Sequence, residues 1–236
     1  MPVNTQAGEP RRPPFDADAA RRLREALGMT PAHVAYGIGA AFGIRISPAT
    51  VASWEGGRST PSEAELTALA GALWCAPGEL LGTPDTLREY RLTLGLAPAD
   101  LALRIGMDQA AYERLEAGGK WNGNDRQAAA LAEVMDLPLP ALIRFTGQDG
   151  KLTELLTSAA TTRWRAYVRP VGKVVPLPKH RLQDVLQELH AEYQATMTAT
   201  LNWGGGESAD ESGRAGRAFL DGILAEFWAR AGTQHS

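Results

Sequence analysis

Apolar residues recur every three or four positions along most of the chain, which is the period of an amphipathic helix. Residues 16–28 show this pattern and end in Gly28, a residue type that commonly terminates helices. A Thr-Pro pair at position 30 and a Ser-Pro pair at position 47 each place a capping residue before a proline, which is typical of a helix start. Residues 16–84 hold no alternating apolar and polar run, so we expect this region to be all helical.

The same plan recurs in residues 86–147. The segment LREALGM at 23–29 aligns with YRLTLGL at 90–96 at an offset of 67, whereas VASWEGG at 51–57 aligns with YERLEAG at 112–118 at an offset of 61. The first copy is therefore six residues longer between these segments, and the extra residues fit the end of its second helix and positions 43–46. The sequence predicts two tandem units of about 65 residues, each with five helices.

The C-terminal third has a different pattern. Apolar and basic or aromatic residues alternate here: Trp164, Ala166 and Val168 alternate with Arg163, Arg165, Tyr167 and Arg169. A Pro-Val-Gly segment at 170–172 then resembles a turn. This alternation predicts a β-hairpin. A helix is expected over 182–201, a flexible link over GGGESADESG at 204–213, and a last helix over 216–231. We therefore expect a small α+β region consisting of a hairpin and two helices.

The charge and composition of the chain limit the classes of function that it can have. The chain has 236 residues, a formal net charge of −3 and a single cysteine, Cys75. A mildly acidic chain holds nucleic acid only through local basic patches, and a lone cysteine fits a reducing cytoplasm. No apolar stretch approaches the roughly 20 residues of a membrane-spanning helix, so we expect no membrane contact.

The second copy, GLAPADLALRIGMDQAAYERLEAG, has three residues that two closely crossing helices need. Ala102 permits close approach, Gly106 permits a positive φ between the helices, and Tyr112 is an apolar plug for the core. The first copy has Ala35, Gly43 and Val51 in the corresponding places, and the segment WEGG follows at 54–57. In these motifs residues 16–147 resemble the Xre/Cro–lambda-repressor family of helix-turn-helix DNA-binding domains.

The resemblance implies that the third helix of each unit lies in the major groove of duplex DNA. It assigns base contacts in both copies to the first residues of that helix and to later residues on the same face. These are Pro48, Ala49, Ala52 and Ser53 in the first copy, and Gln109, Ala110, Glu113 and Arg114 in the second. Gln pairs well with adenine and Arg with guanine, so the second copy carries the better readers.

The resemblance also implies phosphate contacts at helix N-termini and in the loop after the third helix. In the first copy these residues are Thr30, Ser47, Thr50, Arg58 and Ser59, and in the second copy they are Lys120, Trp121 and Asn122. The second copy departs from the family pattern, because Ala97 replaces the usual Ser or Thr and Asp108 brings negative charge. A protein-interaction role for that copy is therefore an alternative.

Other charged residues have simpler interpretations. Arg21, Arg24, Arg88 and Arg91 recur at the offset of 67, and we expect them to form a solvated helix face. Glu55 and Glu116 are expected to cap helices or pair within the fold. Four basic residues in the predicted hairpin are candidate contacts for the DNA backbone or for an anionic ligand, although a structural hairpin with solvated arginines fits equally; they are Arg163, Arg165, Arg169 and Lys173.

These patterns predict a mainly α-helical chain with a flexible arm (1–15), two helix-turn-helix domains (16–84 and 85–148) and a C-terminal dimerisation or ligand-sensing region (149–236). The function that follows is a sequence-specific, duplex-DNA-binding transcriptional regulator in the cytoplasm, associated with the nucleoid when bound. We expect a homodimer, with a small-molecule or protein effector as a further candidate partner. The alternative is a protein-interaction or sensor module whose repeats no longer read DNA. Because no catalytic, cofactor or metal motif occurs, we expect no enzyme activity, cofactor or metal.

Overall fold

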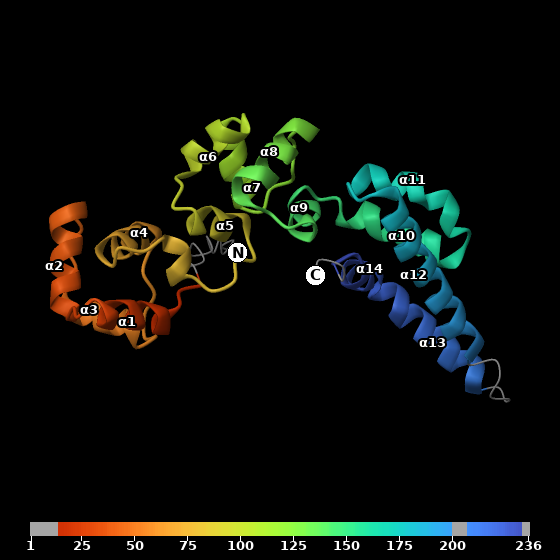
Figure 1. Ribbon diagram of the computed structural model, residues 1–236, viewed down its shortest axis with the longest axis horizontal. Helices are drawn as coiled ribbons and strands as arrows, with labels where there is room; N and C mark the ends of the chain where they lie inside the picture. The colour runs from red at the N-terminus through yellow and green to blue at the C-terminus, as the bar shows by residue number, and fades with distance from the viewer. Residues whose placement is uncertain (1–13, 200–206, 233–236) are drawn as a thin grey trace, which may run out of the picture. The chain divides into compact units, whose positions relative to one another are not determined.

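The computed structural model describes residues 14–199 and 207–232 (Figure 1). Within these residues the chain forms fourteen α-helices and one short 3-10 helix, and the only β pairing is an isolated bridge between Phe15 and Leu81. The prediction of a mainly helical chain is confirmed. The chain divides into two compact units, residues 1–136 and residues 137–236. Most of the predicted N-terminal arm lies outside the described residues, but Phe15 packs against the core of the first unit.

The first unit contains the first sequence repeat and the first four helices of the second. The helices of the first repeat are α1 (Ala17–Ala26), α2 (Pro31–Phe42), α3 (Pro48–Glu55), α4 (Glu63–Ala72) and the 3-10 helix η1 (Pro77–Leu80). Those of the second are α5 (Leu87–Thr93), α6 (Pro98–Ile105), α7 (Gln109–Glu116) and α8 (Asp125–Met135). The predicted Thr-Pro and Ser-Pro starts are confirmed, because Thr30 caps α2 and Ser47 caps α3.

The backbone conformation at the turns also recurs in the two repeats. Four positions of the first repeat have a positive φ, and each has a counterpart in the second at an offset between 61 and 67. The pairs are Gly28 with Gly95, Gly43 with Gly106, Gly57 with Gly118, and Trp74 with Asp136. The left-handed conformation suits glycine because it has no Cβ, so three of these pairs keep the residue type that the turn requires.

The six extra residues of the first repeat lie where the sequence places them. Helix α2 has 12 residues and α6 has 8, so four of the extra residues lengthen a helix by about one turn. The turn from Gly43 to the cap Ser47 is two residues longer than the turn from Gly106 to Asp108. The insertion therefore changes the connection between the paired helices and leaves their caps in place.

The two repeats are joined by packing and by charge. Leu92 of α5 belongs to a buried cluster whose other members, among them Trp54, Leu66 and Leu69, come from the first repeat. Glu63 at the start of α4 pairs with both Arg88 and Arg91 of α5. The second repeat thus begins with a helix that completes the core of the first.

Trp74 occupies a left-handed position with φ 54° while its side chain is 88% exposed. An L-residue in this conformation is strained by roughly 1–2 kcal/mol, and so exposed a side chain gains little from packing. We expect Trp74→Gly to raise the free energy of unfolding by about 0.5–1 kcal/mol, after allowing for the greater freedom of glycine in the unfolded chain. Urea denaturation measures this gain.

Asp136→Gly is the matched control, because Asp136 is the repeat counterpart at φ 48° and aspartate adopts this conformation more readily. Its gain in stability is expected to be smaller. A loss of stability on Trp74→Gly would show that the indole makes contacts that outweigh the strain.

The described residues of the second unit form a bundle of six helices: α9 (Leu139–Phe145), α10 (Asp149–Thr161), α11 (Trp164–Val174), α12 (Lys179–Ala199), α13 (Glu207–Asp221) and α14 (Ile223–Gly232). Its buried cluster draws Leu152 and Leu156 from α10, Val171 from α11, Leu186 from α12 and Phe227 from α14. Helices α12 and α13 lie side by side (Figure 1), and the rings of Tyr193 and Phe219 are 6.1 Å apart. Helix α9, expected to complete the second repeat, contributes Ile143 to this core.

The predicted hairpin is wrong: residues 164–174 form helix α11. Val168, Val171 and Val174 are buried at helical spacing against α10 and α12, and this packing accommodates Pro170 inside the helix. The predicted link is also wrong over residues 207–213, which begin α13, while 204–206 lie outside the described residues. The single predicted last helix is divided at Gly222 into α13 and α14.

None of the described helices is both long enough and apolar enough to cross a membrane.

Candidate nucleic-acid interface

Helix α3 presents its first turn to solvent. Pro48 and Ala49 are exposed, whereas Ala52 and Ser53 are half-buried. The opposite face carries Val51 and Trp54 into the core and fixes the orientation of the helix. Of the four predicted base-contacting positions in the first repeat, the two at the helix start are therefore the more accessible.

The polar residues around α3 form a small hydrogen-bonded set. The Ser47 Oγ accepts a hydrogen bond from the Thr50 amide at 3.1 Å, and the two hydroxyl oxygens lie 2.9 Å apart. The Ser59 hydroxyl donates to the Ser53 Oγ at 2.8 Å. Arg58 is exposed, and its one hydrogen bond to the described residues is a 3.4 Å contact with the Ala52 carbonyl. The α3 helix is therefore flanked by hydroxyl groups and a guanidinium.

Thr30 caps α2 in the same manner. Its hydroxyl oxygen accepts from the His33 amide, and the His33 Nδ1 accepts from the Thr30 amide, both at 3.3 Å. Ala97, its counterpart before α6, has no capping side chain. The first repeat therefore has capped N-termini on both of its paired helices, whereas the second has only Asp108 before α7.

Helix α7 exposes the whole set of predicted readers. Gln109, Ala110, Glu113 and Arg114 are all exposed, and their spacing puts them on one face. The Gln109 Nε2 donates to the Glu113 Oε1 at 2.8 Å, so these two side chains satisfy each other. Arg114 forms no side-chain hydrogen bond or ion pair with the described residues, which leaves its guanidinium available to a ligand.

The loop after α7 is shaped by glycine. A Cβ on Gly119 would lie 2.5 Å from the Arg114 carbonyl oxygen, and one on Gly123 would lie 2.4 Å from the Trp121 ring. The half-buried Trp121 therefore covers Gly123, while Lys120 and Asn122 are exposed beside it. The predicted phosphate-contacting residues of this loop are accessible.

Helices α3 and α7 are each held at their C-terminal end by a buried ion pair, whose arginine partner the sequence analysis missed. Arg24 of α1 donates to both carboxylate oxygens of Glu55 at 2.7 and 2.9 Å, and to the Met29 carbonyl. Arg91 of α5 donates to both oxygens of Glu116 at 2.6 and 3.1 Å, and to the Leu96 carbonyl. The two pairs recur at the repeat offsets.

The prediction of a solvated arginine face is therefore wrong. The side chains of Arg24 and Arg91 are only 12% and 3% exposed, and Arg88 is half-buried against Glu63. Arg21 is exposed but donates to the Glu55 carbonyl at 2.6 Å. The prediction that both glutamates pair within the fold is confirmed. Burial by itself lowers the pKa of Arg91, but the hydrogen bonds and charge of Glu116 and Glu63 outweigh this effect and raise the pKa overall.

Tyr112 adds a proton-dependent element to this set. Its buried hydroxyl donates to the Glu116 Oε1 at 2.5 Å, and burial together with this carboxylate raises its pKa far above the ordinary value of about 10. Above pH 10 the unfolded chain loses this proton while the folded chain keeps it. We therefore expect the tyrosine to contribute a fall in unfolding free energy as the pH rises above about 10.

Tyr112→Phe tests this expectation by urea denaturation at a series of pH values. The variant is expected to be about 1 kcal/mol less stable at pH 7, because it lacks the hydrogen bond, but to lose stability less steeply above about pH 10. Parallel pH profiles for the two proteins would contradict the role given to the hydroxyl.

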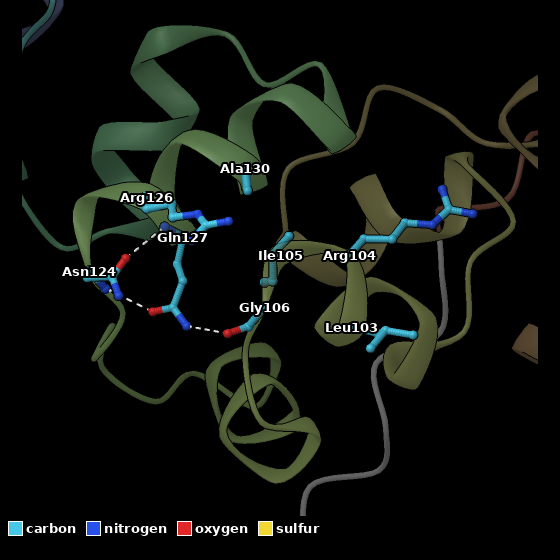
Figure 2. Close-up of a pocket in the computed structure, with 8 residues that line it drawn as sticks. All are labelled: Leu103, Arg104, Ile105, Gly106, Asn124, Arg126, Gln127 and Ala130. Atoms are coloured by element: carbon cyan, nitrogen blue, oxygen red, sulfur yellow. Dashed lines mark hydrogen bonds between the residues drawn. The ribbon is translucent and has the colours of Figure 1, made fainter.

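A pocket of about 370 Å³ lies between the end of α6 and the start of α8. The Gln127 Nε2 donates to the Gly106 carbonyl at 2.6 Å, which ties the turn before α7 to α8 (Figure 2). Arg104 and Arg126 also line the pocket, and Figure 2 shows Arg104 extending away from Asn124 and Gln127. The two guanidinium groups do not converge, so we assign the pocket no anion.

The four basic candidates of the second unit lie at and along α11 rather than on a hairpin. Arg163 precedes the helix, and Arg165, Arg169 and Lys173 lie within it; all four are exposed. The guanidinium of Arg165 lies 5.2 Å from the centre of the Trp164 ring.

In comparisons with known proteins, the chain matches no family model, no curated protein and no solved structure. Among the described residues there is no cluster of three or more side chains suited to a metal ion.

Proposed function

We propose that the chain is a sequence-specific transcriptional regulator that binds duplex DNA through two helix-turn-helix units. The pairs α2–α3 and α6–α7 form the units, and α3 and α7 enter the major groove. The observation that carries the proposal is the repeated setting of α3 and α7. In each repeat a buried Arg–Glu pair holds the end of the helix, while its first turn faces solvent. The resemblance to the Xre/Cro–lambda-repressor family supports the same assignment.

The accessible groups suit the two surfaces that a duplex offers. Helix N-termini have amides without intrahelical acceptors and a partial positive charge, and both features favour phosphate. The first repeat adds the hydroxyls of Ser47 and Thr50 and the guanidinium of Arg58. This set favours backbone contacts over base readout, because Pro48 and Ala49 offer only small apolar surfaces.

The second repeat is better suited to reading bases. Arg114 is exposed without a partner among the described residues, and a guanidinium pairs with two acceptors of guanine in the major groove. Gln109 reads adenine only if it exchanges its bond with Glu113 for the base. Lys120 and Asn122 in the following loop contact the flanking phosphates. In this proposal the first repeat mainly binds the phosphate backbone, and the second repeat mainly reads the bases.

We extend the proposal to a homodimer, because two-fold symmetry lets a regulator bind a palindromic site. The second unit then serves dimerisation or the binding of a small-molecule or protein effector.

A protein-interaction module is the second candidate. Tyr36 on α2 and Leu103 on α6 occupy equivalent repeat positions and are 79% and 81% exposed. A large apolar side chain exposed twice at the same place suits contact with a protein partner. Salt separates the candidates, because counterion release makes DNA binding weaken steeply with ionic strength, whereas an apolar contact does not weaken in this way.

Selection of binding sites from a pool of random duplexes, with the full chain as bait, tests the proposal. We expect an enriched sequence, and binding of that duplex should weaken steeply as salt rises. Equal affinity for the enriched and a scrambled duplex, or no retention of any duplex by the folded chain, would contradict the proposed function.

A further inference from the structure

Helix α11 divides its residues into an apolar and a basic face. Val168, Val171 and Val174 face the core of the second unit. Arg165 and Arg169 are exposed on the other side together with Lys173. These three cations are four residues apart, so they form a row along the helix with a rise of about 6 Å between neighbours.

No described carboxylate neutralises this row. Arg163, Arg165, Arg169 and Lys173 form no ion pair with the described residues, and the chain has no acidic residue between positions 155 and 183. Lys179, exposed at the start of α12, is a further cation in this part of the chain.

The two helices that pack against α11, α10 and α12, do carry acidic residues. Helix α10 has Asp149 and Glu154 in its first half, and α12 has Asp184, Glu188 and Glu192 after its first turn. Glu188 and Glu192 lie within ion-pair distance of Arg230 of α14. The acidic charge of α12 is thus partly engaged by Arg230, whereas the cations of α11 form no ion pair with the described residues.

The chemistry of this face favours a phosphate backbone. Three of the four cations are arginines, whose planar guanidinium donates two hydrogen bonds to one phosphate. A helix that binds a membrane surface needs an apolar face to insert, but the apolar face of α11 is buried in the bundle. The large apolar side chains that are exposed among the described residues all belong to the first unit.

We propose that the basic face of α11, formed by Arg165, Arg169 and Lys173 and preceded by Arg163, binds the phosphate backbone of duplex DNA without reading its sequence. That this is the duplex which α3 and α7 read rests on the proposed function; the backbone contact itself does not. A duplex carries one negative charge per about 1.7 Å of its axis, so a row of cations along one helix faces several phosphates. The second unit therefore adds affinity and leaves discrimination to the first.

The test is the variant Arg165→Gln/Arg169→Gln, compared with Lys151→Gln/Arg217→Gln. Both variants remove two exposed positive charges from the second unit, but only the former removes them from α11. Affinity is measured for the selected duplex and for a scrambled duplex of equal length over a series of salt concentrations. Thermal unfolding of each variant checks that the fold is retained.

We expect the α11 variant to weaken binding to both duplexes by the same factor. The slope of log affinity against log salt should fall in magnitude by nearly two, at roughly 0.9 for each phosphate that is no longer neutralised. The Lys151→Gln/Arg217→Gln variant should keep the slope of the original protein. Equal slopes for the two variants would overturn the proposal, as would a slope change confined to the selected duplex.

The same measurements separate this inference from the proposed function. If the protein prefers no duplex but its salt slope falls in the α11 variant, the backbone contact is supported and the proposed regulator function is contradicted. A membrane role is tested with vesicles of phosphatidylserine and phosphatidylcholine. If these vesicles bind the protein through Arg165 and Arg169 while duplex slopes are unchanged, the phosphate-backbone proposal is wrong.

Discussion

Replacing Arg91 by methionine is expected to lower the free energy of unfolding of the first unit by about 3–5 kcal/mol. The substitution removes the two hydrogen bonds to Glu116, the bond to the Leu96 carbonyl and the pairing with Glu63. It leaves the Glu116 carboxylate, only 10% exposed, with the Tyr112 hydroxyl as its remaining partner. An uncompensated buried charge is strongly unfavourable, and urea denaturation monitored by circular dichroism measures the loss.

Two further variants test whether the unpaired Glu116 carboxylate causes the loss of stability in Arg91→Met. Arg104→Met removes an exposed arginine of the same unit that has no described partner, and should change the stability by no more than about 0.5 kcal/mol. Arg91→Met/Glu116→Leu removes both partners and should recover much of the loss, because an apolar replacement of a buried pair is often neutral. If Arg91→Met is no more harmful than Arg104→Met, the ion pair does not anchor α7.

Arg114→Ala is expected to reduce affinity for the selected duplex by about 5- to 150-fold, which corresponds to 1–3 kcal/mol. The scrambled duplex should be affected far less, because the guanidinium is expected to bind a base edge. Since Arg114 is exposed and unpaired among the described residues, the fold should be unchanged. Fluorescence anisotropy with both duplexes measures the effect.

Lys120→Ala is the control for this prediction. Lys120 lies in the exposed loop after α7, so its removal should weaken both duplexes equally and lower the salt slope by about one. If Arg114→Ala also weakens both duplexes equally, Arg114 contacts the backbone and the assignment of readers is wrong.

The first unit was predictable because its signals are local and duplicated. Thr30 and Ser47 each cap a helix directly before a proline, a pattern that can be recognised in the sequence. Alignment of the two repeats likewise predicts where the six extra residues lie. The buried arginines were missed because a charged side chain is normally exposed, and periodicity cannot reveal a partner 25 or 31 residues away. The joint recurrence of Arg24 with Glu55, and of Arg91 with Glu116, was the signal that could have revealed them.

The second unit was predicted less well because a short alternating run fits two periods. An apolar residue stands at every second position from Trp164 to Val168, but Val168, Val171 and Val174 are three residues apart, which fits only the helical period. Proline and glycine at 170 and 172 suggested a turn, yet packing against α10 and α12 overrides that local preference. The sequence placed the basic residues together, but only the helix puts three of them in one row.

Hydrogen exchange of the full chain, with and without the selected duplex, tests most directly whether α3 and α7 face DNA. Amides in the first turn of a helix lack intrahelical acceptors and exchange fast unless a ligand accepts from them. We predict slower exchange at residue 49 and at residues 109–110 when the duplex is bound; the Thr50 amide, which already donates to the Ser47 Oγ, should change less. Unchanged exchange at both helix starts, while the duplex is held by other residues, would contradict the account.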